Sequence, residues 1–332
     1  MAGLAAACGA FSDASDAPVA GEGGLVAESG SSGEGGAAMD AAPEPDASHV
    51  DAAAEASAPI GRKCAVGTGF QTLTSIPISG GQSIESVRVS ADQSTGYFSV
   101  CPPAAITNCS LFSAAKSGTA FTGFMSMLTG TATTYDAFAT VSSDGAQLVF
   151  DSNRDPSGHT RLFSGTLVDD KVTVAGVSVL PFPATIASPF AASHPYLLTN
   201  GVLYFAARGT ADFDLYRATG PSSSEVAAAA RLDVSDAVQL DFAPVVSEDE
   251  LEVFWATNRT PPLGSAAGGL DVWTASRTPM APNGAFANPE FSAKLSSSME
   301  DHPVWLSPDA CDLYLVRKAT GTSPGTLAVA HR

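Results

Sequence analysis

The sequence predicts an all-β fold, a single β-propeller of four-stranded blades preceded by a disordered N-terminal tether. After residue 60, short segments rich in Val, Phe, Tyr and Leu alternate with clusters of Gly, Ser, Asn, Asp and Pro, and helical periodicity is almost absent. These segments recur in the same order at intervals of about 50 residues, which is the usual length of one blade. We therefore assign residues 63–332 to the propeller.

The first 60 residues have a different composition from the rest. They contain ten acidic residues and neither Lys nor Arg, in a chain whose net charge is −18. The remainder of this stretch is mostly Ala, Gly, Ser and Pro, which cannot bury enough apolar surface to offset the entropy lost on ordering. We predict that residues 9–62 form a disordered, acidic tether.

The chain begins with Leu4-Ala-Ala-Ala-Cys8, which resembles the end of a bacterial lipoprotein signal peptide. Leu4 lies one position too far from Cys8, and the basic start and most of the apolar stretch of such a peptide are missing. The resemblance implies that residues 1–8 are a signal remnant and that Cys8 is acylated. It also implies a periplasmic or cell-surface protein anchored to the outer membrane, with a secreted protein as the alternative.

Each repeat has the same local pattern. An apolar strand ends in a Ser-x-Asp-Gly turn or a variant of it, and a second strand with bulky central residues follows. Asp or Asn in such a turn accepts a hydrogen bond from the backbone two residues later. The turn residues are Asp92, Asp144, Asn200, Asp249 and Asp309. The third strands begin near Ser110, Arg161, Asp214, Asp271 and Leu327, and a less regular fourth strand completes each unit.

The repeat Ser-x-Asp-Gly…Phe-x-Ser-Asn-Arg…Asp-Leu-Tyr resembles that of TolB-like propellers, a WD-like repeat of bacterial envelope proteins. Residues 142–163, 244–277 and 303–331 match it best, and the resemblance extends over residues 66–332. It implies a propeller fold and a location in the cell envelope. Five repeats favour five blades, and six blades, the usual number in the resembled family, are the alternative.

The two ends of the folded region are predicted to share a blade. The last unit reaches only its third strand, and an extra strand-like segment, residues 69–78, precedes the first unit. Pairing the two completes the last blade and leaves no open edge. Cys64 and Cys311 then lie in one blade and are expected to form a disulfide. A second disulfide is expected between Cys101 and Cys109, which flank a turn.

Acidic residues recur just before the predicted innermost strands, which line the channel of a propeller. We expect them, with two nearby histidines, to form an acidic ring at one mouth that binds a cation, an amine or sugar hydroxyls. The alternative is a structural role in turn and strand-entry hydrogen bonds. The candidate ligand-binding residues are Glu85, Asp136, His194, Asp241, Asp301 and His302.

Four arginines, Arg154, Arg208, Arg259 and Arg317, follow the second strands. We expect them to pair with acids at the start of the third strands, namely Asp214 and Asp271. Because such pairs would recur from blade to blade, a structural role is the default interpretation.

Two functions fit this organisation. The first is a non-catalytic, monomeric envelope protein that binds a protein, peptide or glycan. The alternative is a five-bladed glycoside hydrolase that uses two carboxylates at the channel mouth, so whether the protein is an enzyme stays open. We expect no cofactor, with a divalent cation at the acidic ring as the alternative. The acid excess excludes nucleic acid as a partner, and contact with a membrane is expected only through a lipid anchor.

Overall fold

The computed structural model describes residues 61–71, 73–78, 83–102, 108–118, 120–128, 135–168, 175–186, 189–209, 212–236, 238–263, 265, 268–278, 285–319 and 325–332. The predicted signal remnant with Cys8 and nearly all of the predicted tether lie outside this part of the chain. Within it, no helix is long and apolar enough to cross a membrane.

The described strands form five antiparallel sheets of four strands each, which confirms the five-bladed propeller. Blade 1 contains β2 (Ser83–Val89), β3 (Thr95–Cys101), β4 (Ser110–Ser117) and β5 (Ala120–Ser126). Blade 2 contains β6 (Asp136–Val141), β7 (Gln147–Ser152), β8 (Arg161–Thr166) and β9 (Ala175–Val179). Blade 3 contains β10 (Ala191–Leu197), β11 (Leu203–Arg208), β12 (Asp214–Ala218) and β13 (Ala230–Arg231).

Blade 4 contains β14 (Asp241–Val246), β15 (Glu252–Thr257), β16 (Asp271–Ser276) and β17 (Ala287–Phe291). Blade 5 contains β18 (Glu300–Leu306), β19 (Asp312–Lys318), β20 (Thr326–His331) and β1 (Thr74–Ser75). A short helix, α1 (Ser223–Ala227), links β12 to β13 and begins with a capping box formed by Ser222 and Glu225.

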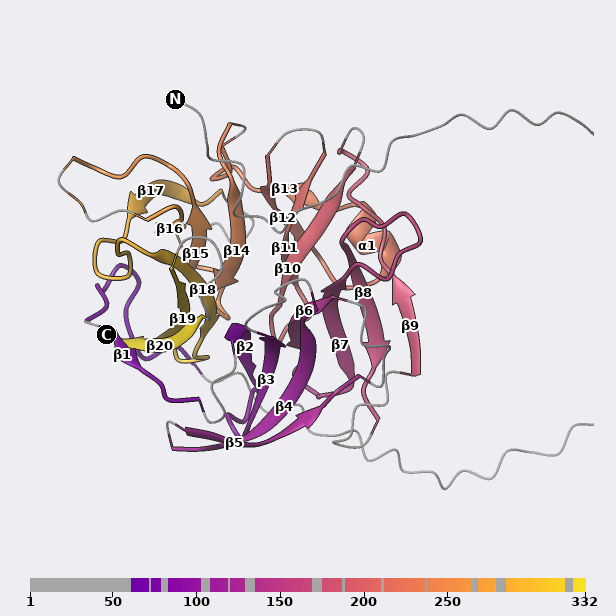
Figure 1. The fold of residues 1–332 in the computed structure, drawn as a ribbon. Helices are drawn as coiled ribbons and strands as arrows, with labels where there is room; N and C mark the ends of the chain where they lie inside the picture. Colours follow the sequence, from indigo (N-terminus) through magenta and orange to yellow (C-terminus); the bar gives the residue numbers. More distant parts are fainter. Residues whose placement is uncertain are drawn as a thin grey trace, which may run out of the picture. The chain divides into compact units, whose positions relative to one another are not determined.

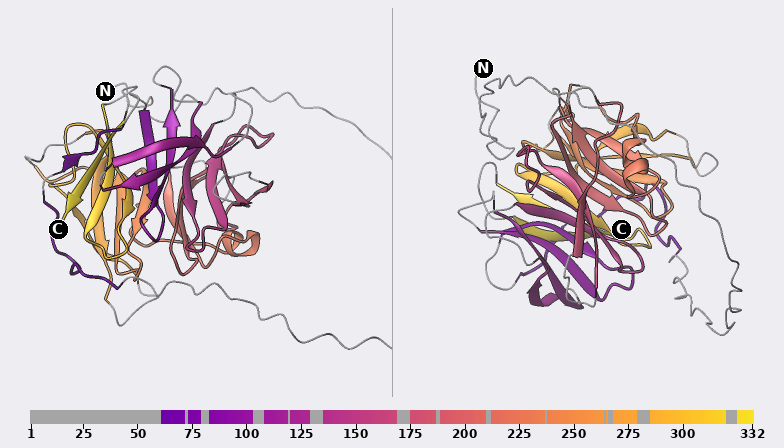
Figure 2. Two further views of the ribbon diagram at one scale, coloured as in Figure 1. Left: turned by 90° about the horizontal axis from the view of Figure 1, so that it is seen from below. Right: turned by 90° about the vertical axis from the view of Figure 1, so that its right-hand side faces the viewer.

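The first strand of each blade lies at the centre of the ring. β2 contacts β6, β6 contacts β10, β10 contacts β14, β14 contacts β18, and β18 returns to β2. Figure 1 shows these five strands around the middle, with the outermost strands β1, β5, β9, β13 and β17 at the periphery. The two further views in Figure 2 show neighbouring strands rotated relative to one another, as in the usual twist of β-sheets.

The core lies between the blades. The centre of each second strand carries one large apolar residue with no exposed surface, namely Phe98, Phe150, Phe205, Trp255 and Leu315. The predicted turns also form in all five blades. The oxygens of Asp92, Asp144, Asn200, Asp249 and Asp309 each accept a hydrogen bond from the backbone N–H two residues later, at 3.0–3.3 Å.

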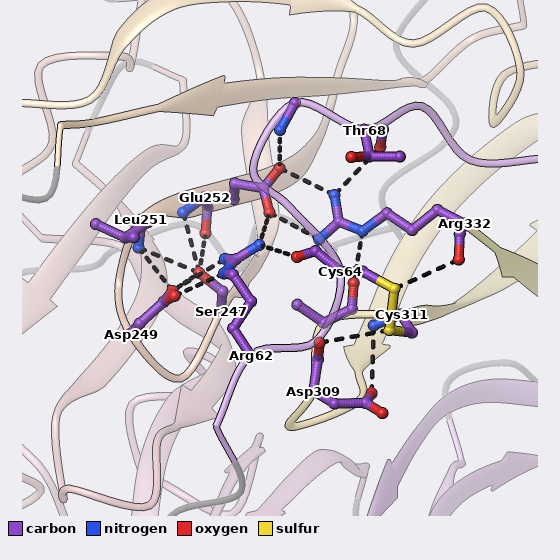
Figure 3. Close-up of polar contacts among 12 residues, drawn as sticks. Arg62, Cys64, Thr68, Ser247, Asp249, Leu251, Glu252, Asp309, Cys311 and Arg332 are labelled. Atoms are coloured by element: carbon purple, nitrogen blue, oxygen red, sulfur yellow. Dashed lines mark hydrogen bonds and ion pairs between the residues drawn. A yellow bond between two sulfur atoms is a disulfide. The ribbon is translucent and has the colours of Figure 1, made fainter.

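The last blade is completed by the N-terminal strand, as predicted. β1 pairs with β20, and the Cys64–Cys311 disulfide joins two residues 247 positions apart in sequence. The second predicted disulfide, Cys101–Cys109, is also present. Figure 3 shows that Arg62 and Arg332 both reach Glu252 of blade 4 beside the Cys64–Cys311 bridge. The ends of the folded region are therefore fixed to each other and to the neighbouring blade.

Candidate functional site

Three of the predicted ring acids occupy equivalent positions at the start of their innermost strands, and each is already paired with an arginine. The pairs are Asp136 with Arg154 at 2.7 Å, Asp241 with Arg259 at 2.8 Å, and Asp301 with Arg317 at 2.5 Å. In each pair the arginine belongs to the next strand of the same blade or to the residues just after it. Each of these three acids therefore recurs together with a paired arginine.

This pairing corrects the expected partners of the arginines. Asp214 pairs instead with Arg231 at 2.7 Å, and Asp271 accepts a hydrogen bond from the backbone N–H of Gly268 at 3.4 Å. Arg208 lies over the ring of Phe190, 4.5 Å from its centroid. The acids on the innermost strands are closer to the arginines because antiparallel pairing places the end of a second strand opposite the start of the first.

Further hydrogen bonds fix two of these acids. Asp241 accepts from the indole N–H of Trp255 at 3.0 Å and from the backbone N–H of Asp236 at 2.7 Å. Asp301 accepts from the backbone N–H of Ser297 at 2.7 Å. Burial raises the pKa of both carboxyl groups, and the hydrogen bonds and arginines oppose that shift. These contacts give a structural reason why an acid recurs at this position of the innermost strands. Ligand binding by the predicted ring residues stays a prediction.

The fourth acid, Glu85, pairs with Lys318 of blade 5 rather than with a residue of its own blade. The two histidines lie beside Phe242 of β14, with ring centroids 5.2 Å away for His194 and 5.4 Å away for His302. His194 also lies against Phe138 at 3.7 Å. Burial lowers the pKa of both imidazoles, so they are neutral at neutral pH. The histidines thus gather around aromatic rings within the channel.

Two small cavities lie along the channel. The first, of about 20 Å³, is lined by residues from the innermost strands of all five blades, including His194 and Pro244. The second, of about 40 Å³, lies at the end where the Ser-x-Asp turns connect first to second strands. We call this second cavity and its lining the turn-side mouth; its central residues are Arg88, Tyr97, Tyr196, Glu248 and Trp305. It is at the opposite end of the innermost strands from the predicted acidic ring.

Arg88 of β2 separates the two cavities, together with Tyr196 of β10, because both residues line each of them. The guanidinium carbon of Arg88 lies 3.2 Å from the centroid of the Tyr196 ring. Its Nη1 donates to the carbonyl oxygen of Val304 at 3.3 Å, whereas its Nη2 is buried without a hydrogen-bond partner. Arg88 is only 6% exposed, and burial lowers its pKa to about 10.

Glu248 brings a carboxylate to the same mouth from the turn between β14 and β15. It accepts hydrogen bonds from the backbone N–H of Thr199 at 2.9 Å and from the Thr199 hydroxyl at 2.6 Å. Burial raises the pKa of Glu248, while these hydrogen bonds and the charge of Arg88 act in the opposite direction. The floor of the mouth, formed by Arg88, Tyr196 and Trp305, is buried, and Ser143 at its rim is exposed.

The two cavities differ from a hydrolytic site in their carboxylates. Among the described residues that line the two cavities, Glu248 is the one carboxylate, whereas glycoside hydrolysis needs two that face one bond. In the same described ranges no group of three or more His, Cys, Asp or Glu residues is placed to hold a metal ion. The mouth instead combines one buried cation, one carboxylate, hydroxyl groups and aromatic rings.

The chain matches no protein-family model and no curated protein. Solved structures similar to it include a TolB from Agrobacterium tumefaciens, at 13% identity and a TM-score of 0.45, covering 72% of this chain and 71% of that chain. A mannose phosphorylase from Leishmania mexicana, solved with phosphate, has 11% identity and a TM-score of 0.45 over 79% and 87% of the two chains.

A puromycin-hydrolysing peptidase from Mycobacterium tuberculosis is also similar, at 15% identity and a TM-score of 0.41. The likeness covers 75% of this chain but only 37% of the peptidase. The predicted likeness to TolB-type propellers is thus found among solved structures. The five-bladed fold itself is established by the strand pairing of this chain.

Proposed function

We propose that this protein is a non-catalytic binding propeller of the cell envelope whose ligand, a protein, peptide or glycan, docks at the turn-side mouth. The observation that carries the proposal is Arg88, a buried guanidinium with an N–H group that has no partner in the structure. An unmade hydrogen bond on a buried charged group is costly, so an acceptor supplied by a ligand is stabilising there.

The shape of the mouth supports the same proposal. Its rim is exposed and its floor is buried, so a ligand reaches Arg88 from solvent without passing through the channel. The residues come from the strands or turns of different blades, which a propeller holds in fixed relative positions. Such a preorganised surface lowers the entropy lost on binding.

The cellular compartment of the protein is inferred from its two disulfides. Two disulfides are typical of proteins in oxidising compartments outside the cytosol. We further propose a periplasmic or cell-surface location, with an anchor on acylated Cys8. Mass spectrometry of the mature protein for an acylated Cys8 tests the anchor directly.

The binding role is tested by blocking the mouth. Ser143→Trp adds a large side chain at the exposed rim, and Met125→Trp adds the same side chain to β5 in the outer part of blade 1, at a residue 49% exposed. The full-length chain and both variants are used for affinity capture from an envelope extract. We expect the parent and Met125→Trp to recover the same component and Ser143→Trp to lose it. Equal recovery by all three proteins would contradict docking at this mouth.

A further inference from the structure

We propose that the turn-side mouth recognises a carboxylate group carrying a single negative charge, with Arg88 as its anchor and Glu248 as the group that excludes a second negative charge. This inference rests on the proposed binding function and specifies the chemistry of the ligand. It concerns residues for which the sequence patterns had suggested no role.

The first argument is the charge of Arg88. Nine other described arginines form ion pairs within 4.0 Å, namely Arg62, Arg154, Arg161, Arg217, Arg231, Arg259, Arg277, Arg317 and Arg332. Arg88 has no carboxylate within that distance among the described residues, although it is only 6% exposed. A buried cation without a paired anion is unfavourable. Glu248 attracts the guanidinium from beyond that distance, and a carboxylate in the cavity would supply the direct partner and the acceptor that Nη2 lacks.

The second argument is the orientation of the guanidinium. The Tyr196 ring covers one face at 3.2 Å, and the carbonyl oxygen of Val304 accepts from Nη1. The N–H groups of a guanidinium lie in its plane, so stacking on one face leaves its edge for hydrogen bonds. The Nη2 atom on that edge has no partner, and Arg88 lines the cavity. Carboxylates are the acceptors that bind such an edge most strongly.

The third argument is size. A cavity of about 40 Å³ accommodates roughly three water-sized groups, since one water needs at least ~10–15 Å³. The three heavy atoms of a carboxylate group match that volume, whereas a whole sugar ring does not. The rest of the ligand therefore lies outside the cavity, against the exposed rim near Ser143.

The fourth argument is the effect of Glu248. It lines the same cavity and its position is fixed by two hydrogen bonds from Thr199. A carboxylate ligand gains attraction from Arg88 and some repulsion from Glu248. For a doubly charged ligand such as phosphate both Coulomb energies double, but the cost of removing it from water grows with the square of its charge, so repulsion from Glu248 leaves too little attraction to offset that cost. Replacing Glu248 by Gln should therefore strengthen carboxylate binding, which is the opposite of what loss of a simple contact would do.

A carboxylate can come from a free small acid or from the carboxyl terminus of a peptide. The probes are acetate, inorganic phosphate, a tripeptide with a free carboxyl terminus and the same tripeptide amidated. Binding to the full-length chain is measured by ligand-observed NMR. We expect the free tripeptide to bind at least about tenfold more tightly than the amide, a difference of about 1.4 kcal/mol, and phosphate to bind more weakly than acetate. Binding of acetate equal to that of the free tripeptide would identify a small-acid site.

Variants connect this selectivity to the proposed residues. Arg88→Met should remove the preference for the free carboxyl group, Arg88→Lys should reduce it, and Glu248→Gln should increase carboxylate affinity several-fold. Lys63→Met is the charge control, because it also removes one positive charge but at an exposed side chain. It should leave the preference unchanged.

Several outcomes would overturn the inference. They are equal binding of acid and amide, an unchanged preference in Arg88→Met, or no probe binding at all, which would mean that water fills the cavity. If Arg88→Met fails to fold, the expected gain in Glu248→Gln decides the question. If Ser143→Trp abolishes ligand capture while acid and amide bind equally, the binding function stands and the carboxylate inference fails.

Discussion

The guanidinium of Arg332 lies 2.7 Å from the carboxylate of Glu252, so the C-terminal residue is attached to β15 of the neighbouring blade. Arg62 donates to the same carboxylate at 2.6 Å, and the backbone N–H of Gly67 donates at 2.9 Å. Burial opposes ionisation of Glu252, but the donors from Arg332, Gly67 and Arg62 together hold its pKa below the usual value. Figure 3 shows this carboxylate as the centre of the closure between the two ends.

Neutralising Glu252 should destabilise the ring closure. Glu252→Gln keeps the side-chain shape but leaves two arginines without their shared anion, and the side chain of Arg332 is only 1% exposed. Breaking a buried ion pair costs about 3–5 kcal/mol, and each kcal/mol lowers Tm by about 2–4 °C in a domain of this size. Thermal unfolding measures the shift. Glu290→Gln, at an exposed position of β17, is the matched control, and equal Tm values for the two variants would contradict the prediction.

The two disulfides should contribute unequally to stability. Cys64–Cys311 closes a loop with a sequence separation of 247, and Cys101–Cys109 closes one of 8. In the chain-entropy model their removal costs roughly 5 and roughly 3 kcal/mol, because the longer loop restricts the unfolded chain more. The double Cys→Ser variants of each pair are compared by urea unfolding. A larger loss from removing Cys101–Cys109 would argue against this closure model.

Much of the fold could be predicted from the sequence because repetition is a strong signal. The turn residues, such as Asp144 and Asp309, recur at blade-length intervals, and the strand missing at one end appears at the other, at residues 74–75. The Cys64–Cys311 disulfide followed from that organisation, and the Cys101–Cys109 disulfide followed from the turn that these two residues flank. A pattern that repeats in every blade predicts the structure that the blades share. It does not predict which blade contributes residues to a binding site.

The turn-side mouth could not be predicted in the same way, because it is built from residues that do not repeat. Arg88, Tyr196 and Glu248 come from three blades and have no common motif. One signal was present, a basic residue at position 88 between two valines of an innermost strand. The acids at the other end repeat, and their partners Arg154, Arg259 and Arg317 repeat with them. Spacing alone suggested different partners for those arginines.

Asp151 should make stability depend on pH with an unusual sign. Its carboxyl group is fully buried, accepts a hydrogen bond from the Ser193 hydroxyl, and has one oxygen without a partner. Burial raises its pKa from 3.8 to about 8. The folded state therefore holds the proton more tightly than the unfolded state does. The contribution of this group to stability is complete below about pH 4 and is lost as the pH rises to about 8.

Asp151→Asn removes this titration while keeping the shape of the protonated carboxyl group. We expect the variant to gain stability relative to the parent as the pH rises from about 5 to about 8, by at most about 1.4 kcal/mol per pH unit. Urea unfolding at several pH values measures the difference. The control is Asp144→Asn, since the pKa of Asp144 is lowered and the equivalent turn already contains Asn200. Its difference from the parent should stay constant over this range, and a constant difference for Asp151→Asn would contradict the prediction.

The last prediction separates a structural from a ligand-binding role for the ring acids. Asp241 has no exposed surface and accepts hydrogen bonds from Arg259, Trp255 and the backbone of Asp236. Asp136 pairs with Arg154, whose side chain is 26% exposed. If the role of the acids is to form these contacts, Asp241→Asn should lower the free energy of unfolding by about 3 kcal/mol. Asp136→Asn should lower it by clearly less, because water compensates the more exposed side chain of Arg154.

The same two variants test ligand binding when Ca²⁺ is titrated into the full-length parent and each variant. Free carboxylates that converge on one cation would make Tm rise with Ca²⁺ concentration in the parent but not in the variants. If the acids are purely structural there is no such rise, because Arg154, Arg259 and Arg317 already supply the positive charge that three of the acids require. A rise in the parent that is lost in Asp136→Asn and Asp241→Asn, with both variants still folded, would show that the ring binds a cation in addition to its structural contacts.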